Sequence, residues 1–193
     1  MGCDIHIYTE KKDREGNWNC VDFFVPNTMF GKYEDEIKEF EIKEFYHDRD
    51  YELFGALAGV RGEIPHIDQK GFPEDASERL KNLNKDYGCD GHSHSYLTLG
   101  ELKEHQNSLG NTIKRSGVIS LQQAEDLEKG IKPNGWCQGT SDKTWVRRDW
   151  TATHNPMDFF MGQLQTFLGF RFWNYEVRDM NDEDFRVVFW FDN

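Results

Sequence analysis

The alternating segment GCDIHIYTE (residues 2–10) opens the chain and decides its fold. In an extended strand every second side chain shares a face, so the segment separates an apolar set from a polar set. The apolar set is Cys3, Ile5 and Ile7, and the polar set is Asp4, His6, Tyr8 and Glu10. A polar turn, DREGN (residues 13–17), follows, and residues 18–25 can return as the second arm of a hairpin.

The other end of the chain predicts the rest of the sheet. Residues 187–191, VVFWF, are apolar without a break, which is typical of a strand buried on both faces at the centre of a sheet. Residues 171–178 predict a strand before it. Helix-capping residues predict five helices between the terminal strands, beginning near Asp50, Asp75, Thr98, Ser120 and Asn155.

These patterns predict an α+β fold in a single domain, residues 1–193. Its mainly antiparallel sheet is formed by the N- and C-terminal strands, and the helices between them pack against it. Residues 26–45 fit a charged strand as well as a short helix. Residues 131–154 show no steady periodicity and predict a long loop that carries three tryptophans.

Composition narrows the classes of partner. The chain has 23 Lys and Arg against 35 Asp and Glu, a net charge of −12, which argues against a long nucleic acid as partner. A small anionic or nucleotide ligand remains compatible with a local arginine cluster or a bound metal. Four cysteines without a C-x-x-C pair, no signal-peptide pattern and no apolar run of about 20 residues indicate a cytoplasmic protein without a membrane partner.

Two histidine-containing clusters indicate a metal. Asp4 and His6 are about 7 Å apart on one strand face, so both can reach one ion. Asp90, His92 and His94 alternate in GCDGHSHS (residues 88–95), which is expected on a loop. If this loop packs against the first strand, the side chains suit a divalent transition metal such as zinc, manganese, iron or nickel. The alternative is a polar strand face and a loop whose histidines are only hydrogen-bonding partners.

Arginines beside aromatic residues form a third candidate site. Arg49 and Tyr51 precede the apolar stretch of residues 53–58, and Arg61 follows it. A guanidinium group can hold a phosphate or carboxylate through two hydrogen bonds, although structural ion pairing is the alternative in so acidic a chain. Arg147 beside Trp145 is a weaker version of the same pattern, with a plain surface rim as its alternative.

Four motifs carry a family resemblance. They are MGCDIH (residues 1–6), RDYELFGALAGVRG (49–62), GCDGHSHSYLTLGEL (88–102) and VVFWFDN (187–193). Together they resemble a group of small tailed-phage and prophage proteins. The resemblance implies a viral accessory protein in a bacterial cytoplasm, and it makes counter-defence a reasonable context, but it implies no reaction.

Three functional hypotheses follow. The first is a metal-dependent hydrolase or phosphodiesterase of a small phosphorylated or nucleotide-like immune signal. In it, Asp4, His6, His92 and His94 hold the ion, Asp90 orients a ligand or takes a proton, and Arg49 and Arg61 neutralise the substrate. The second is a binding protein without turnover that sequesters a nucleotide signal, using Arg49, Tyr51, Arg61, Trp145 and Arg147. The third is an acidic inhibitor that acts on another protein.

Overall fold

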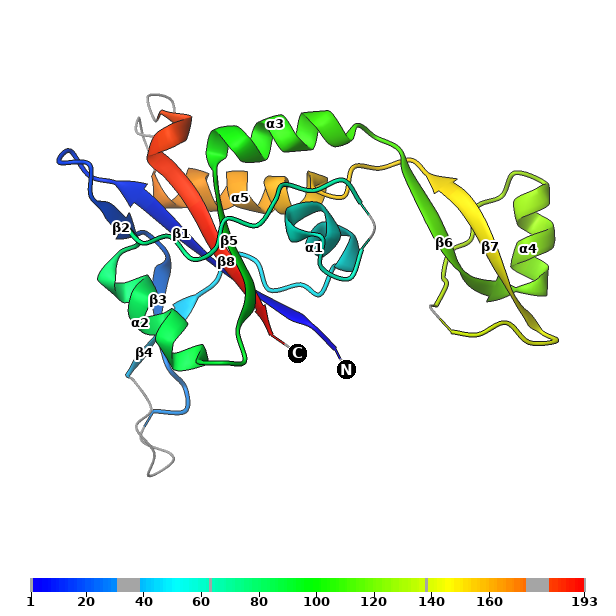
Figure 1. Ribbon diagram of the computed structural model, residues 1–193, viewed down its shortest axis with the longest axis horizontal. Helices are drawn as coiled ribbons and strands as arrows, with labels where there is room; N and C mark the ends of the chain where they lie inside the picture. The colour runs from blue at the N-terminus through cyan, green and yellow to red at the C-terminus, as the bar shows by residue number, and fades with distance from the viewer. Residues whose placement is uncertain (1, 31–38, 63, 138, 173–180, 193) are drawn as a thin grey trace. The chain divides into compact units, whose positions relative to one another are not determined.

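The structure, a computed structural model, describes residues 2–30, 39–62, 64–137, 139–172 and 181–192 (Figure 1). The chain divides into two compact units, which are described separately. Unit 1 is Met1–Asn107 with Pro156–Asn193, and unit 2 is Ser108–Asn155. The single domain over residues 1–193 stays a prediction. Among the described helices, none is long and apolar enough to cross a membrane.

Unit 1 is built on a four-stranded antiparallel sheet with the order β2-β1-β8-β5. The strands are β1 (Asp4–Lys12), β2 (Trp18–Cys20), β5 (His92–Thr98) and β8 (Phe185–Asp192). Asp4 pairs with Asp192, so the two ends of the chain lie side by side (Figure 1). The predicted α+β fold with a sheet of N- and C-terminal strands is confirmed.

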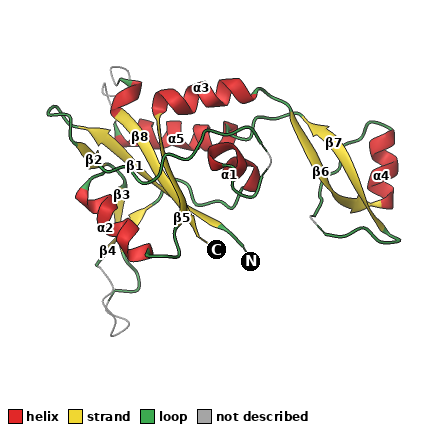
Figure 2. Cartoon of the chain, in the orientation of Figure 1, coloured by secondary structure: helices red, strands yellow, loops and turns green. Residues whose placement is uncertain are grey.

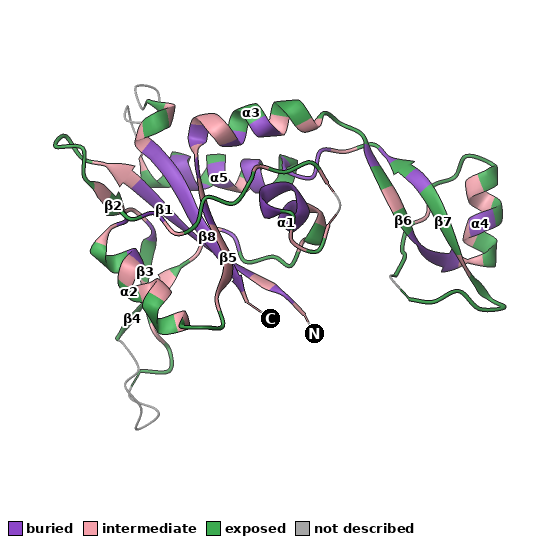
Figure 3. Ribbon diagram, viewed as in Figure 1, coloured by how far each residue is buried: buried purple, intermediate pink, exposed green. Residues whose placement is uncertain are grey.

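β8 is the centre of this sheet. It pairs with β1 on one side and β5 on the other, and every residue from Phe185 to Phe191 is buried (Figure 3). The unbroken apolar run predicted this position correctly, because a strand covered on both faces needs apolar side chains in both directions.

Helices cover both faces of the sheet. On one face, Phe54 of α1 (Tyr51–Ala58) packs edge-on against Phe191, with ring centroids 5.2 Å apart. On the other face, Leu80 of α2 (Glu78–Tyr87) is fully buried in a cluster with Tyr8, Val188 and Trp190. The face of β1 that was expected to be polar is therefore partly in the core. Tyr8 is buried under α2, whereas Asp4 and His6 are only half-buried.

The remaining elements of unit 1 lie around this core (Figure 2). α3 (Leu99–Leu109) is tied to α1, because His105 Nε2 donates to the Ala56 carbonyl at 2.8 Å. β3 (Phe23–Pro26) and β4 (Phe40–Lys43) form a hairpin, which resolves part of the ambiguous stretch 26–45 as strand. α5 (Asp158–Arg171) precedes a short 3₁₀ turn, Asp182–Asp184. The predicted strand 171–178 begins inside α5, and residues 173–178 lie outside the described residues.

Three of the five helix starts, at Asp50, Thr98 and Ser120, were predicted well, whereas those at Asp75 and Asn155 were not, since α5 begins at Asp158. Asp50 caps α1 by accepting from the backbone N–H groups of Glu52 and Leu53 at 2.9 and 3.2 Å. Asp75 was expected to cap the second helix, but Ser77 is the cap. The Asp75 carboxylate instead accepts from Arg186 Nη1 at 2.8 Å, because a buried guanidinium needs an anionic partner.

Glu10 of β1 and Arg186 of β8 form a buried ion pair on the face of the sheet that α2 covers. Arg186 Nε donates to Glu10 Oε2 at 2.9 Å, and both side chains are almost fully buried. The other Glu10 oxygen accepts from the backbone N–H of Ser77 at 2.7 Å. Glu10 therefore stabilises the start of α2.

Unit 2 is a hairpin with one helix. β6 (Ile113–Ser120) pairs with β7 (Trp145–Ala152) over eight residue pairs, and α4 (Leu121–Glu128) follows β6. The predicted helix after Ser120 is confirmed, with a complete capping box between Ser120 and Gln123. The predicted irregular loop over residues 131–154 is wrong where β7 forms. Its two arginines, its aspartate and its exposed Trp145 hid the alternation of a strand that packs on one face only.

Candidate functional site

One end of the sheet gathers charged side chains on the face that α2 covers. Asp4 pairs with Asp192 and His6 with Trp190, so these four side chains point to the same side. Glu44, just after β4, and Tyr87, the last residue of α2, reach the same place through contacts with His6. We call Asp4, His6, Glu44, Tyr87 and Asp192 the polar end.

His6 is the centre of the polar end. Its Nδ1 lies 2.9 Å from the Tyr87 hydroxyl and 3.5 Å from Glu44 Oε1, and its Nε2 lies 3.3 Å from Asp192 Oδ2. Burial alone would lower the pKa of His6, but the hydrogen bonds and charges of Glu44 and Asp192 outweigh it and raise that pKa above its ordinary value. The arrangement therefore favours an imidazolium cation.

This geometry suits hydrogen bonding better than metal binding. Glu44 and Asp192 contact opposite nitrogens of one imidazole ring, so the two carboxylates face each other across the ring and do not converge on one point. A metal ligand needs one ring nitrogen free of a proton, whereas two carboxylate partners favour a proton on both nitrogens. His6 can therefore donate hydrogen bonds or release a proton.

The second histidine cluster is a turn over residues 88–90 and a strand from His92 onward, and it does not alternate as predicted. Residues 92–98 form β5, and the pairing with β8 shifts between His92 and Ser95. Ser93 takes a left-handed conformation, φ 52°. This bulge turns the two histidines to opposite faces: His92 stacks on Phe191 and His94 stacks on Trp190. The expectation that His92 and His94 share a face is therefore wrong.

His94 is held as a neutral ring. Its Nε2 lies 2.6 Å from Asn84 Oδ1, which can only accept, so this nitrogen is the donor. Burial, followed by the nearby charge of His92, lowers the pKa of His94. His6 and His94 thus shift in opposite directions on one face.

The expected metal ligands are not gathered around one point. β1 and β5 both flank β8, which puts their backbones about 10 Å apart. The Trp190 ring lies between, 6.2 Å from the His6 ring and 5.8 Å from the His94 ring. Within the described ranges, no group of three or more His, Cys, Asp or Glu could hold a metal ion. A divalent transition metal stays a prediction that this geometry does not support.

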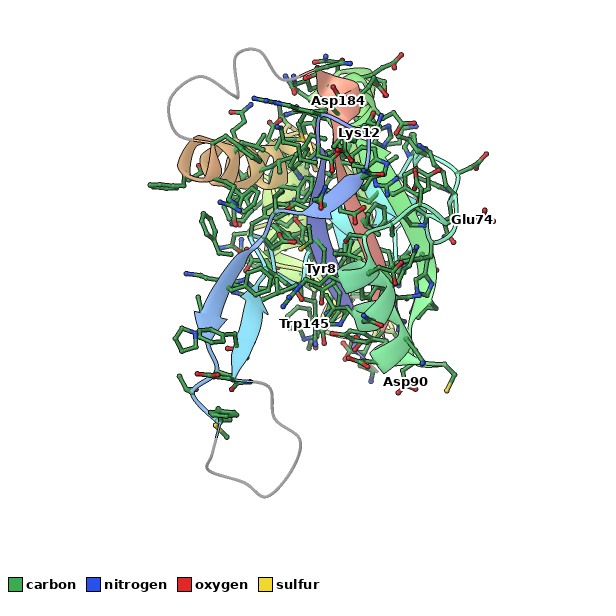
Figure 4. All side chains as sticks on the ribbon, turned by 90° about the vertical axis from the view of Figure 1, so that its left-hand side faces the viewer. Tyr8, Lys12, Glu74, Asp90, Trp145 and Asp184 are labelled. Carbon is green, nitrogen blue, oxygen red and sulfur yellow. The ribbon has the colours of Figure 1, made fainter. Side chains whose placement is uncertain are left out.

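Asp90 lies in the turn that ends α2. Its backbone N–H donates to the Tyr87 carbonyl at 3.1 Å, and its side chain is exposed (Figure 4). The role of Asp90 in orienting a ligand or taking a proton stays a prediction.

Arg49 contacts the polar end through Asp4. Its Nε donates to Asp4 Oδ1 at 2.7 Å and its Nη2 to Asp4 Oδ2 at 2.6 Å, and both side chains are half exposed. The guanidinium lies against the backbone of Gly2, where an added Cβ would be 2.6 Å from Arg49 Nη1. Glycine at position 2 therefore leaves the space that this two-bond contact occupies.

Tyr51 and Arg61 both contact Cys3, next to Asp4 in the chain. The Tyr51 hydroxyl accepts from the Cys3 N–H at 3.3 Å, and the Arg61 side chain hydrogen-bonds the Cys3 thiol. Burial raises the pKa of that thiol, so Cys3 is not an activated nucleophile. Both arginines around α1 thus contact residues 2–4, but the side chains of Cys3 and Asp4 point to opposite faces of the strand. An anion site shared by the two arginines stays a prediction.

Trp145 and Arg147 belong to unit 2, on β7, and both are exposed. They share one face of that strand, two residues apart.

Sequence reasoning missed Glu44, Tyr87, Asn84 and Asp192. Asp192 had a signal, because antiparallel pairing of the terminal strands sets the last acidic residue opposite Asp4. The other three come from segments whose approach to His6 or His94 depends on packing, and no local pattern marks them.

No family model, curated protein or solved structure matches the chain. The chemistry of the polar end is therefore the basis for a function.

Proposed function

We propose that the protein binds a small phosphorylated or nucleotide-like ligand at the polar end and holds it without turnover. The observation that carries this proposal is the two-bond contact between Arg49 and the half-exposed carboxylate of Asp4. Arg61 and Tyr51 contact the neighbouring residue Cys3, so a second cation and an aromatic ring are close by.

The Asp4 carboxylate resembles the ligand in charge and shape. A guanidinium group binds carboxylate and phosphate oxygens through the same pair of parallel hydrogen bonds. Because water reaches both Arg49 and Asp4, the pair adds little stability, and an incoming phosphate can replace the carboxylate at small cost. Asp4 then acts as an internal competitor for the anion.

His6 provides a second donor for a ligand that carries two negative charges. Its raised pKa keeps the ring cationic at higher pH than an ordinary histidine, and its neighbour Asp192 is a third exposed. An anion at Arg49 would lie on the same sheet face as this ring, because Asp4 and His6 are two residues apart on β1.

Hydrolysis with the help of a divalent transition metal is the competing function. His6 could give a proton to a leaving group, but the ligands expected to hold the ion lie apart. An acidic inhibitor of another protein is the other competitor, and it needs no small ligand.

The resemblance to phage and prophage proteins supports a context for sequestration. Under this proposal the protein acts in the cytoplasm of a bacterial host, and the ligand is an immune signal made from nucleotides. Removing such a signal by binding is a counter-defence function.

The three functions give different results in one experiment. Purified protein is incubated with cyclic dinucleotides and ADP-ribose derivatives, with and without EDTA, and is then desalted and denatured. Chromatography with mass spectrometry follows the released compounds. We expect intact ligand in both arms. Altered product that disappears with EDTA would favour the hydrolase, and no retained compound would favour the inhibitor.

A further inference from the structure

The charge of the chain is divided unevenly between its two units. Unit 2 contains seven Lys and Arg and five Asp and Glu, a net charge of +2. The rest of the chain contains 16 and 30, a net charge of −14. Net charge therefore disfavours a nucleic-acid partner for unit 1 but not for unit 2.

One face of the β6–β7 hairpin forms part of the hydrophobic core of unit 2. Ile119 and Trp150 pack with Ala124 of α4 on this face. Trp136 covers the same face, because an added Cβ on Gly117 would lie 2.5 Å from its ring. This face therefore packs against α4 and Trp136, although Arg148 on it is exposed.

The opposite face of the hairpin is mostly exposed, although Val118, which pairs with Arg147 on this face, is buried. The exposed side chains of this face are Lys114, Ser116, Trp145, Arg147, Asp149 and Thr151. The indole of Trp145 is 44% exposed. Arg147 follows about 7 Å along the same strand, and Lys114 is about 20 Å from Trp145 at the far end of the face.

Local contacts hold this arrangement in place. The backbone N–H of Trp145 donates to Asp142 Oδ1 at 2.8 Å, and the backbone N–H of Arg147 donates to Ser141 Oγ at 3.1 Å. Arg147 Nη2 also donates to the Gly139 carbonyl at 3.2 Å, and the guanidinium has further N–H donors that can bind an anion.

We propose that this face binds single-stranded nucleic acid. A base stacks on Trp145, and phosphates about two nucleotides apart contact Arg147 and Lys114, which are about 13 Å apart along the face. An exposed ring followed by spaced cations matches the alternation of base and phosphate along a strand whose bases are unpaired. An acidic protein surface would use the cations but would gain little from the exposed indole. This proposal is independent of the ligand at the polar end.

The contacts between the cations and the phosphates make this binding salt-dependent. At physiological ionic strength charges are screened beyond about 8 Å, so the cations of the face act mainly on phosphates in contact with them. The affinity is therefore modest and falls as salt rises from about 50 to 200 mM, because counterions are released from the strand.

Fluorescence anisotropy of a labelled 12-nucleotide oligo(dT) on the full-length protein tests the proposal. We expect Trp145→Ala to weaken binding about tenfold, the loss of one stacked base. Arg147→Glu and Lys129→Glu change the net charge equally, but Lys129 is on the end of α4 and not on the face. We therefore expect Arg147→Glu to abolish binding and Lys129→Glu to change it less than about twofold.

Four results would overturn the proposal. They are no binding of oligo(dT) at 50 mM salt, equal loss in Arg147→Glu and Lys129→Glu, equal binding of a DNA duplex, and displacement by polyglutamate as effective as by unlabelled oligo(dT). The last result would show that the face takes an acidic protein. Matching thermal unfolding curves show that each variant is folded.

Discussion

His6 and His94 lie on the same face of the sheet, on the two strands that flank β8, with the Trp190 ring between them. One ring is held by two carboxylates and the other by an amide. The two histidines therefore have different chemistry although both belong to short D-x-H or H-x-H patterns.

The two rings should titrate on opposite sides of the ordinary histidine pKa. Carboxylate contacts raise the pKa of His6, and burial lowers the pKa of His94. The His6 contribution to stability is thus present below about pH 6.5 and lost as pH rises through its raised pKa, whereas the His94 contribution is present above about pH 6.5 and lost as pH falls through its lowered pKa. Two-dimensional NMR of the imidazole protons measures both values.

Glu44→Gln provides the control for this titration. It removes one anionic partner, so the pKa of His6 should fall while that of His94 stays. Equal pKa values for the two rings in the native protein would contradict the described contacts.

Asp22 should make the protein more stable in mild acid. Burial raises the pKa of this carboxyl to about 6, although Thr9 donates two hydrogen bonds to it. The folded state then binds a proton more readily than the unfolded state, so stability is highest below about pH 4 and falls as pH rises to about 6. The shift corresponds to about 3 kcal/mol.

Asp22→Asn removes the titrating group, and its free energy of unfolding should lose this dependence on pH. Urea denaturation between pH 4 and 8 makes the comparison. A native protein whose stability rises across this window in step with the variant would show that Asp22 is charged throughout.

The buried pair of Glu10 and Arg186 should be sensitive to loss of one partner. Arg186→Met leaves the Glu10 carboxylate buried without its cation, and we expect a loss of about 3–5 kcal/mol in unfolding free energy. Replacing both residues, Glu10→Leu with Arg186→Met, removes the unpaired charge and should recover most of the loss. Chemical denaturation of the three proteins is the measurement, and a double variant less stable than Arg186→Met would contradict this explanation.

Removal of metal should leave the protein unchanged. Since Trp190 separates His6 from His94, we expect elemental analysis to find no stoichiometric transition metal, and dialysis against EDTA to leave the unfolding temperature as it was. One metal per chain, lost together with stability on chelation, would restore the hypothesis of a metal centre.

The central strand and the helix starts could be predicted because their signals are local. The apolar run before Asp192 predicted β8, and Asp50 predicted the start of α1. The position of His92 could not be predicted, because the left-handed Ser93 that turns it away is not a glycine and has no marker in the sequence. Glu44 and Tyr87 approach His6 only through tertiary packing.

The positions of the two arginines in the fold could be predicted in part. Arg49 and Arg61 lie on either side of one predicted helix, which α1 confirms. Their actual partners, Asp4 and Cys3, depend on how that helix packs on the sheet.

The central claim is that Arg49 binds the ligand anion and that Asp4 competes with it. Calorimetric titration with ADP-ribose and with inorganic pyrophosphate tests it on the native protein, Asp4→Asn and Arg49→Gln. The account predicts tighter binding by Asp4→Asn, since the competing carboxylate is gone, and loss of binding by Arg49→Gln. Weaker or unchanged binding by Asp4→Asn, together with native affinity in Arg49→Gln, would contradict it.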